Sequence, residues 1–511
     1  MDIGTRNSKI AKNTVALYIR MLFTTIVSLY TSRVVLQALG VEDFGLYGLV
    51  GGVVAMLGFI NTALSGATSR FITYELGAGN KQRLNKTFIS ALLIHICIAI
   101  LLFLIAETIG LWFVNTKLII PEQRIVAANI VYQCSILTAV INLIQVPYTA
   151  TIIAHERMGV FAAIEIFNTT LKLLIAYSLM LLSGDQLSLY AIFLLFVAAI
   201  VLLTYRTYCS KKFDESRAKI IYDPSIFKPM LSFAGWDLYG NMCVTVRQQG
   251  INILLNRFFG LVVNAANSIT MMFNGAILGF ANNIVMAFRP QIVKTYSNSD
   301  WPRFNLLMKN ALQFSMLFFI MLSIPCFVEI ETILNVWLKE VPDYTAKFCR
   351  ISLIVNCLSV ANTVFGAGIH ATGKIKKISL ITGTLFLTTL IVAYLLLRCG
   401  FGAPSVYIAS CVIMLLVIIS NLLILKSQIY QVELRQLLVS LLKVAVVSIL
   451  TFVPIYLCYT LLEQGIIRLL INCCISAFVT VVLGYIIILS PQQRQNINEM
   501  VKDKLRSKLC R

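Results

Sequence analysis

Long apolar stretches recur along almost the whole chain, and short polar segments separate each one from the next. A helix that crosses a lipid bilayer needs ~20 consecutive apolar residues, so each stretch predicts one membrane-spanning helix. The pattern predicts fourteen spans: 13–36, 46–66, 87–113, 125–147, 161–182, 187–205, 233–256, 264–286, 308–328, 350–371, 378–397, 405–425, 444–462 and 469–489. We therefore expect an all-α polytopic membrane protein.

The composition leaves little room for anything else. Of the 511 residues, 59% are apolar and only 13% are charged, about half the share of a soluble domain. Fourteen spans would use ~280 residues, which excludes a soluble catalytic domain, a secreted enzyme and a single-span receptor. The thirteen cysteines form no C-x-x-C pair and the three histidines lie far apart, so we expect neither a metal site nor another cofactor.

The basic residues sort by side of the membrane. If the N-terminus is cytoplasmic, thirty of the 42 Lys and Arg residues fall on the cytoplasmic side, eight on the other side and four inside spans. Lys and Arg are enriched in cytoplasmic loops, so this distribution supports the span count and predicts that both termini are cytoplasmic. The net charge of +20 then reflects topology and not a nucleic-acid partner.

Three matches at offsets of 217 to 220 residues indicate an internal repeat. The matched pairs are Gly40 with Gly260, Arg70 with Arg289, and AHERMG at 154–159 with ATGKIK at 371–376. Six spans separate the matched positions, and an even number means that both halves enter the membrane from the same side. Transporters are commonly built from such parallel repeats, which rock against each other around a central cavity.

The repeat predicts five parts. An N-terminal six-helix lobe covers 1–206, a basic cytoplasmic linker covers 207–232, and a C-terminal six-helix lobe covers 233–426. Two additional transmembrane helices occupy 427–490, and a basic cytoplasmic tail occupies 491–511.

The seventh predicted span carries a polar stripe. Its members recur every three or four residues, which places them on one face of a helix: Asp237, Asn241, Thr245, Gln248, Asn252 and Asn256. Arg247 lies beside the stripe at mid-span. So polar a face cannot contact lipid, which leaves two alternatives: a water-filled cavity, or a polar seam between packed helices.

The first and fifth predicted spans also hold ionisable residues. Arg20 lies about seven residues inside the first span, and Thr24 follows one turn later on the same face. Glu165 and Lys172 share a face of the fifth span, seven residues apart. They would either compensate each other inside the membrane, or Lys172 would add positive charge to the cavity.

Four segments resemble a known family. SRVVLQALGVEDFGLYGLV at 32–50, AFRPQIVKTY at 287–296, VWLKEVPDY at 336–344 and GIHATGKIKK at 368–377 are similar to the polysaccharide-flippase branch of the MOP exporter superfamily. The resemblance extends over about 8–400. It implies a two-lobed bundle that moves lipid-linked oligosaccharide units from the inner to the outer leaflet of the bacterial inner membrane, for surface polysaccharide or O-antigen synthesis.

In that family the lipid carrier is undecaprenyl pyrophosphate, and the resemblance also implies downstream polysaccharide-assembly proteins as partners. Guanidinium groups make paired hydrogen bonds to phosphate oxygens, while amides and hydroxyls suit neutral sugars. The candidate substrate-binding residues are therefore Arg20, Thr24, Lys172, Asp237, Asn241, Arg247, Gln248 and Asn252.

Two other functions stay open. A cation-coupled multidrug antiporter of a sister branch usually relies on a carboxylate in the first helix, and 13–36 contains none, although Asp237 is comparable. A membrane glycan polymerase or ligase would need a larger outward loop than this sequence contains. The acids in the outward segment around 329–344 are expected to be solvated. Transport would be driven by the membrane potential, or by H⁺ or Na⁺ through Asp237 or Glu165.

Overall fold

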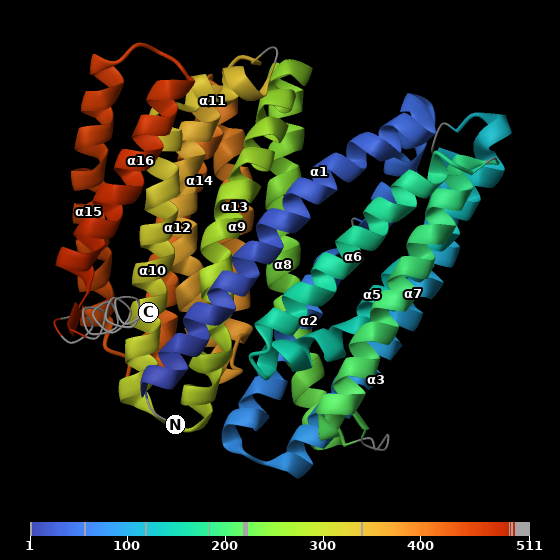
Figure 1. Cartoon of the computed structure of the whole chain (residues 1–511), viewed down its shortest axis with the longest axis horizontal. Helices are drawn as coiled ribbons and strands as arrows, with labels where there is room; N and C mark the ends of the chain where they lie inside the picture. The colour runs from blue at the N-terminus through green and yellow to red at the C-terminus, as the bar shows by residue number, and fades with distance from the viewer. Residues whose placement is uncertain are drawn as a thin grey trace, which may run out of the picture. The chain divides into compact units, whose positions relative to one another are not determined.

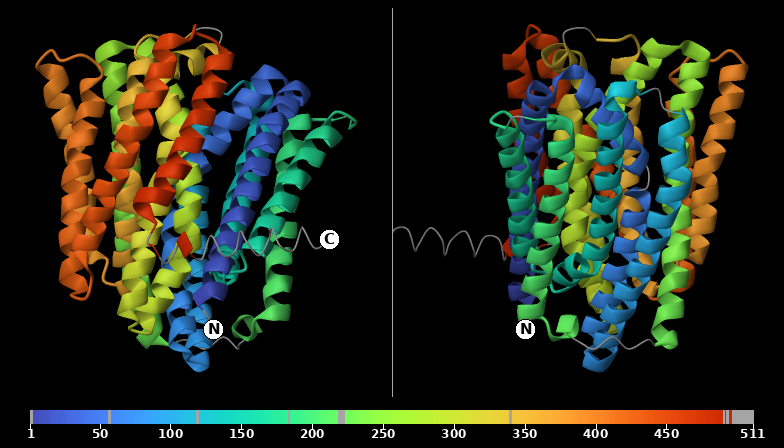
Figure 2. Two further views of the ribbon diagram at one scale, coloured as in Figure 1. Left: turned by 60° about the vertical axis from the view of Figure 1, so that its left-hand side comes forward. Right: turned by 90° about the vertical axis from the view of Figure 1, so that its right-hand side faces the viewer.

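The computed structural model describes residues 3–55, 58–117, 120–182, 184–217, 223–338 and 341–489, together with 491, 494 and 495. Within these residues every regular element is a helix, which confirms the all-α prediction. The predicted basic tail at 491–511 lies outside the described residues except for those three positions. Figures 1 and 2 show long helices, several of which run side by side.

Sixteen α-helices follow one another along the described chain (Figure 1). The first seven are α1 (Ile3–Ala55), α2 (Gly58–Ala78), α3 (Lys81–Ile105), α4 (Leu111–Lys117), α5 (Ile125–Ala154), α6 (Met158–Leu179) and α7 (Gln186–Lys212). The others are α8 (Pro224–Phe259), α9 (Leu261–Ser297), α10 (Trp301–Val328), α11 (Ile330–Trp337), α12 (Thr345–Thr372), α13 (Lys376–Arg398), α14 (Ser405–Gln428), α15 (Leu434–Leu461) and α16 (Ile466–Leu483).

Twelve helical segments of the described chain are long and apolar enough to cross a membrane, so the protein is a multi-span membrane protein. Two of the fourteen predicted spans, 46–66 and 233–256, are not among the twelve. The described residues of both are helical. Within α8 the polar stripe lowers the mean hydropathy, and 46–66 is divided between α1 and α2.

Glycines end two helices at equivalent places in the repeat. Gly40 interrupts α1 with a φ of 76° and a ψ of 172°, so the residues on either side of it form two helices that meet at a kink. Gly260, its repeat partner, separates α8 from α9 with a φ of 80°. Residues with a Cβ are strained at such positive φ values, which explains why both positions hold glycine.

The chain forms two compact units that do not follow the order of the sequence. Unit 1 contains 1–245, 287–300 and 370–383, and unit 2 contains 246–286, 301–369 and 384–511. The helices α8, α9, α12 and α13 therefore each pass from one unit into the other. The two six-helix lobes stay a prediction.

In unit 1, α5 is the central helix. It packs against α2, α3 and α7, while α1 packs mainly against α6. Buried Tyr132 of α5 donates a hydrogen bond of 2.8 Å to the carbonyl of Ala106, where a short π-helical turn follows α3. A Cβ on Gly110, in the same turn, would lie 2.0 Å from the Tyr132 hydroxyl, so glycine is needed for this close approach.

The residues before α8 favour a helix start. Pro224 stands at the first helical position, where its missing N–H costs no intrahelical bond. The Asp223 carboxylate accepts hydrogen bonds from the Ser225 hydroxyl and backbone N–H and forms an ion pair with Lys86 of α3. These interactions lower the pKa of Asp223 to about 2, and the hydrogen bond from the Ser225 hydroxyl has the largest effect.

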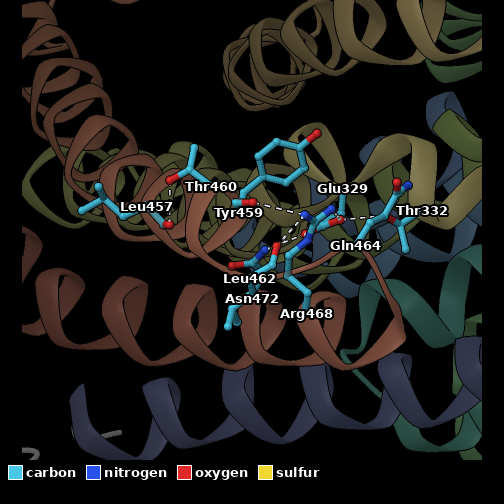
Figure 3. Close-up of polar contacts among 9 residues, drawn as sticks. All are labelled: Glu329, Thr332, Leu457, Tyr459, Thr460, Leu462, Gln464, Arg468 and Asn472. Carbon is cyan, nitrogen blue, oxygen red and sulfur yellow. Dashed lines mark hydrogen bonds and ion pairs between the residues drawn. The ribbon is translucent and has the colours of Figure 1, made fainter.

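A buried ion pair in unit 2 joins α16 to the start of α11 (Figure 3). Arg468 donates to both carboxylate oxygens of Glu329, at 2.7 and 3.0 Å. Asn472 also donates to Glu329, at 2.8 Å, and the Arg468 guanidinium lies 4.2 Å from the centre of the Tyr459 ring. Arg468 further donates to the carbonyls of Tyr459 and Leu462, so this one side chain holds the end of α15, the connection and α16 together.

The prediction that the acids of 329–344 are solvated is wrong for Glu329, which is 1% exposed. Glu331 and Asp343 are exposed as expected, and Glu340 lies outside the described residues. Sequence spacing could not identify the buried acid, because its partner Arg468 is 139 residues away.

Candidate functional site

Arg20 lies in the interior of unit 1, between α1, α6 and α7. Its guanidinium carbon is 4.9 Å from the centre of the Phe161 ring on α6. Glu165, one turn further along α6, is the main negative charge that acts on Arg20, and its carboxylate accepts a hydrogen bond of 2.9 Å from the Tyr205 hydroxyl of α7. The charged group thus lies among aromatic and acidic side chains of α6 and α7.

Lys172 shares the same acidic partner. It is exposed on α6, two turns beyond Glu165, and the negative charge of Glu165 acts on it as well. The charge of one carboxylate, Glu165, therefore acts on both Arg20 and Lys172, and these three side chains together carry a net positive charge. Such an excess is suited to an anion.

Thr24 stands one turn after Arg20 and is half-buried. Its hydroxyl donates to the carbonyl of Met21 at 3.2 Å, within its own helix. The hydroxyl oxygen keeps its capacity to accept a hydrogen bond.

Asp237 belongs to a second buried group in unit 1. Its carboxylate lies 3.8 Å from Nε2 of His370, at the end of α12, and the His370 ring nitrogen Nδ1 lies 3.3 Å from Nη2 of Arg289 on α9. A guanidinium can only donate, so Nδ1 accepts and the proton of the neutral imidazole is on Nε2, facing Asp237. The Arg289 charge also acts on Asp237. A Cβ on Gly66 of α2 would lie 3.0 Å from the carboxylate.

Arg70 of α2 completes this group. It is 8% exposed, and its guanidinium lies over the rings of Phe71 and Tyr74, at 4.6 and 4.8 Å from their centres. Its Nη2 donates to the carbonyl of Ala371 at 3.1 Å. Gly373 fits against the same guanidinium, because a Cβ there would lie 2.6 Å from Nη2.

Replacing Gly373 with alanine is expected to destabilise the protein by about 1–3 kcal/mol, because the new Cβ meets both a positive φ of 77° and the Arg70 guanidinium. Gly400→Ala is the matched control: its φ is 87°, but no heavy atom lies within 4 Å of the added Cβ. Thermal unfolding of both variants in detergent measures the difference. Equal losses of stability would show that the contact with Arg70 contributes nothing.

Arg247 lies in unit 2 with its guanidinium carbon 4.8 Å from the centre of the Phe386 ring on α13. Its Nε is buried and has no hydrogen-bond partner among the described side chains and backbone groups. Buried polar groups are nearly always hydrogen-bonded, and a cation within a membrane is costly. A cation held by a ring but lacking this bond is suited to an anionic ligand.

Some residues of the polar stripe of α8 form hydrogen bonds within the helix, and others form them with neighbouring helices. Asn241 donates to the carbonyl of Asp237 at 2.8 Å, within the helix, and Gln248 is exposed. Asn252 accepts a hydrogen bond from Asn267 of α9, and Asn267 accepts one from the Tyr407 hydroxyl of α14 at 2.5 Å. The end of the stripe thus contributes to helix packing inside unit 2, and its role in binding substrate stays a prediction.

Sequence reasoning missed the convergence of Arg70, Arg289 and His370. The sequence marks Arg70 and Arg289 only as equivalent positions of the repeat, and His370 only as one of three histidines that lie far apart. The internal repeat could have indicated that Arg70 and Arg289 lie close together, because equivalent residues of two repeats related by an axis can meet near that axis. Within the described ranges, no group of three or more His, Cys, Asp and Glu side chains is placed to hold a metal ion.

Solved structures of several membrane transporters have a fold similar to that of this chain. A multidrug resistance MATE family transporter of the MOP superfamily, in its outward-facing conformation, matches with a TM-score of 0.71 at 14% identity, over 83% of this chain and 95% of that one. A MOP superfamily transporter from Pyrococcus furiosus, described as having a binding pocket of reversed polarity, matches with a TM-score of 0.70 at 12% identity, over 83% and 96%. The fold is that of the MATE and MOP transporters.

The family follows from the sequence. The model of the family described as "Polysaccharide biosynthesis protein" matches residues 10–296, which is more than half of the chain, and the chain belongs to this family. No curated protein matches it. The protein is thus a multi-span membrane protein of this polysaccharide-biosynthesis family, with the fold of the MATE and MOP transporters.

Proposed function

We propose that the protein flips oligosaccharide units linked to undecaprenyl pyrophosphate from the inner to the outer leaflet of the bacterial inner membrane. The observation that carries this proposal is Arg247, a half-buried cation that lies against Phe386 and whose buried Nε has no described hydrogen-bond partner. The family supports a role in polysaccharide synthesis, and the fold supports transport.

The proposed binding residues divide by chemistry. Arg20, Lys172 and Arg247 would attract the pyrophosphate, because it carries at least two negative charges and accepts several hydrogen bonds. Thr24, Asn241, Gln248 and Asn252 would contact the sugars. Membrane lipid surrounds the carrier tail, and the units delivered would pass to downstream polysaccharide-assembly proteins. Neither nucleic acid nor a catalytic residue has a role in this scheme.

Rocking of the two predicted six-helix lobes would expose the binding residues to each leaflet in turn. Both termini are proposed to be cytoplasmic, as the distribution of basic residues indicates. The membrane potential favours outward movement of a negative head group by ~2.3 kcal/mol per charge per 100 mV. Asp237, buried beside His370 and Arg289, is the proposed site of any coupling to H⁺ or Na⁺.

The alternative function is a cation-coupled antiporter for small amphipathic compounds, and the buried carboxylate of Asp237 is the observation that favours it. Such a carboxylate can bind and release a coupling cation as a transporter changes conformation. The excess of cations around Glu165 favours an anionic substrate instead.

The experiment is to locate lipid-linked glycan in a host that lacks this chain. We expect complete repeat units to accumulate on undecaprenyl pyrophosphate at the cytoplasmic leaflet, together with loss of surface polysaccharide. Repeat units that reach the outer leaflet but stay unpolymerised would contradict the proposal and indicate a polymerase or ligase. Normal surface glycan with altered sensitivity to toxic cations would indicate the antiporter.

A further inference from the structure

Two contacts in unit 1 connect segments that belong to different sequence repeats. In the first, Arg70 in the second half of α2 donates to the carbonyl of Ala371 and packs against Gly373, in the turn between α12 and α13. The Arg70 side chain is buried, and it also lies 6.0 Å from the centre of the Phe233 ring on α8. This contact depends on a backbone acceptor and on the missing Cβ of one glycine.

In the second contact, Glu156 in the turn between α5 and α6 holds the end of α9. One carboxylate oxygen of Glu156 accepts a hydrogen bond from Gln291 at 2.6 Å, and the other forms an ion pair with Lys294 at 2.6 Å. Glu156 is 4% exposed and has a φ of 58°, a conformation that is unfavourable for a residue with a side chain. Buried charge-assisted hydrogen bonds of this kind are among the stronger ones in proteins.

The ends of α2 and α9 also touch directly. A Cβ on Gly77 would lie 3.0 Å from the Cα of Lys294, so these two helix ends approach backbone to backbone. The two helices are repeat equivalents, since Arg70 corresponds to Arg289.

The repeat relates the two contacts to each other. The turns 154–159 and 371–376 are equivalent, and within them Glu156 occupies the place of Gly373. Both residues have a positive φ, 58° and 77°. The equivalent helices α2 and α9 therefore each bind the turn of the other repeat. In one contact the turn holds a glycine that leaves room for an arginine, and in the other it holds a glutamate that binds a lysine and a glutamine.

We propose that these crossed contacts are a two-part latch, which holds the cytoplasmic ends of the two repeats together and must open when substrate enters from that side. The inference rests on the proposed rocking of two lobes but not on the identity of the substrate. Any movement that separates the two repeats must break both contacts, because each joins a residue of 1–206 to a residue of 233–426. The predicted topology puts both contacts on the cytoplasmic side.

The two parts differ in strength and in kind. The Glu156 part is ionic and loses most of its energy when either charge is removed. The contact between Arg70 and the turn requires that residue 373 has no Cβ. A variant can therefore weaken either part separately, without altering the proposed substrate-binding residues.

The test uses the full chain with its thirteen cysteines replaced and spin labels at exposed positions 82 and 298, one in each repeat. Both lie in unit 1, so their separation reports the latch itself. We expect E156Q/K294M to increase the population with the longer distance about tenfold, since it removes one buried charged interaction. An unchanged distance distribution in a correctly inserted variant would overturn the latch, whatever happens to surface glycan.

A second measurement locks the latch covalently. E156C/K294C treated with a short reagent that joins two thiols should lose transport, and cleavage of the link should restore it. H155C/E215C is the matched control, because this pair is also 2.6 Å apart in the native protein but lies within 1–232. Full transport by linked E156C/K294C would overturn the latch. If the latch opens and closes, but a host that lacks this chain still distributes its lipid-linked glycan normally, the latch is supported and the proposed substrate is refuted.

Discussion

Replacing Arg247 with glutamate is expected to reduce transport at least about tenfold while the protein remains inserted in the membrane. The guanidinium lies against Phe386, and its Nε is buried without a described acceptor, so the proposed pyrophosphate would supply an acceptor for this cation. Glutamate removes that donor and places a negative charge opposite the phosphates. The measurement is surface polysaccharide in a deletion host that expresses each variant, normalised to the amount of protein in the membrane.

Three variants control this result. Arg247→Lys keeps the charge but not the paired donors, and should retain intermediate activity. Arg247→Ala should lose less activity than the glutamate variant, because it adds no repulsion. Arg33→Glu changes an exposed arginine of α1 and should have a mild effect. Near-full transport by both Arg247→Ala and Arg247→Glu would refute the role of Arg247.

Replacing Arg468 with methionine is expected to destabilise the folded protein by ~3–5 kcal/mol. The change leaves the carboxylate of Glu329 buried without its bidentate partner and removes the bonds to the carbonyls of Tyr459 and Leu462. An uncompensated charge in a site that is 1% exposed accounts for most of the loss. Thermal unfolding in detergent, followed by the burial of native cysteines, measures the effect.

Two controls separate the buried charge from the loss of packing. The double variant E329Q/R468M should be more stable than Arg468→Met alone, since no charge is left unpaired. Arg350→Met breaks an ion pair of 3.1 Å with Glu331, which is 55% exposed, and should cost less than about 1 kcal/mol. Equal stability of Arg350→Met and Arg468→Met would show that the Glu329 pair contributes no more than a surface pair.

The sequence by itself determined the local structure and the class of protein. Apolar stretches of about twenty residues predict helices, because a helix of that length crosses a bilayer and satisfies its backbone hydrogen bonds within one segment. The positive φ at Gly40 and Gly260 follows the repeat that the sequence predicted. The polar stripe of α8 was also visible, because residues three and four positions apart share one face of a helix wherever that helix lies.

Only the tertiary structure decided which distant residues meet. Nothing in the spacing of Glu329 and Arg468, or of Glu156 and Lys294, distinguishes these residues from solvated charges at the ends of spans. Nor does the sequence mark the carbonyl of Ala371 as the acceptor for Arg70. The physical reason is that helical periodicity fixes the face of a residue on its own helix, whereas its partner depends on the packing of whole helices and on the turns between them. Glu156 and Gly373 therefore share a positive φ but make different contacts: Gly373 leaves room for Arg70, and Glu156 binds Lys294.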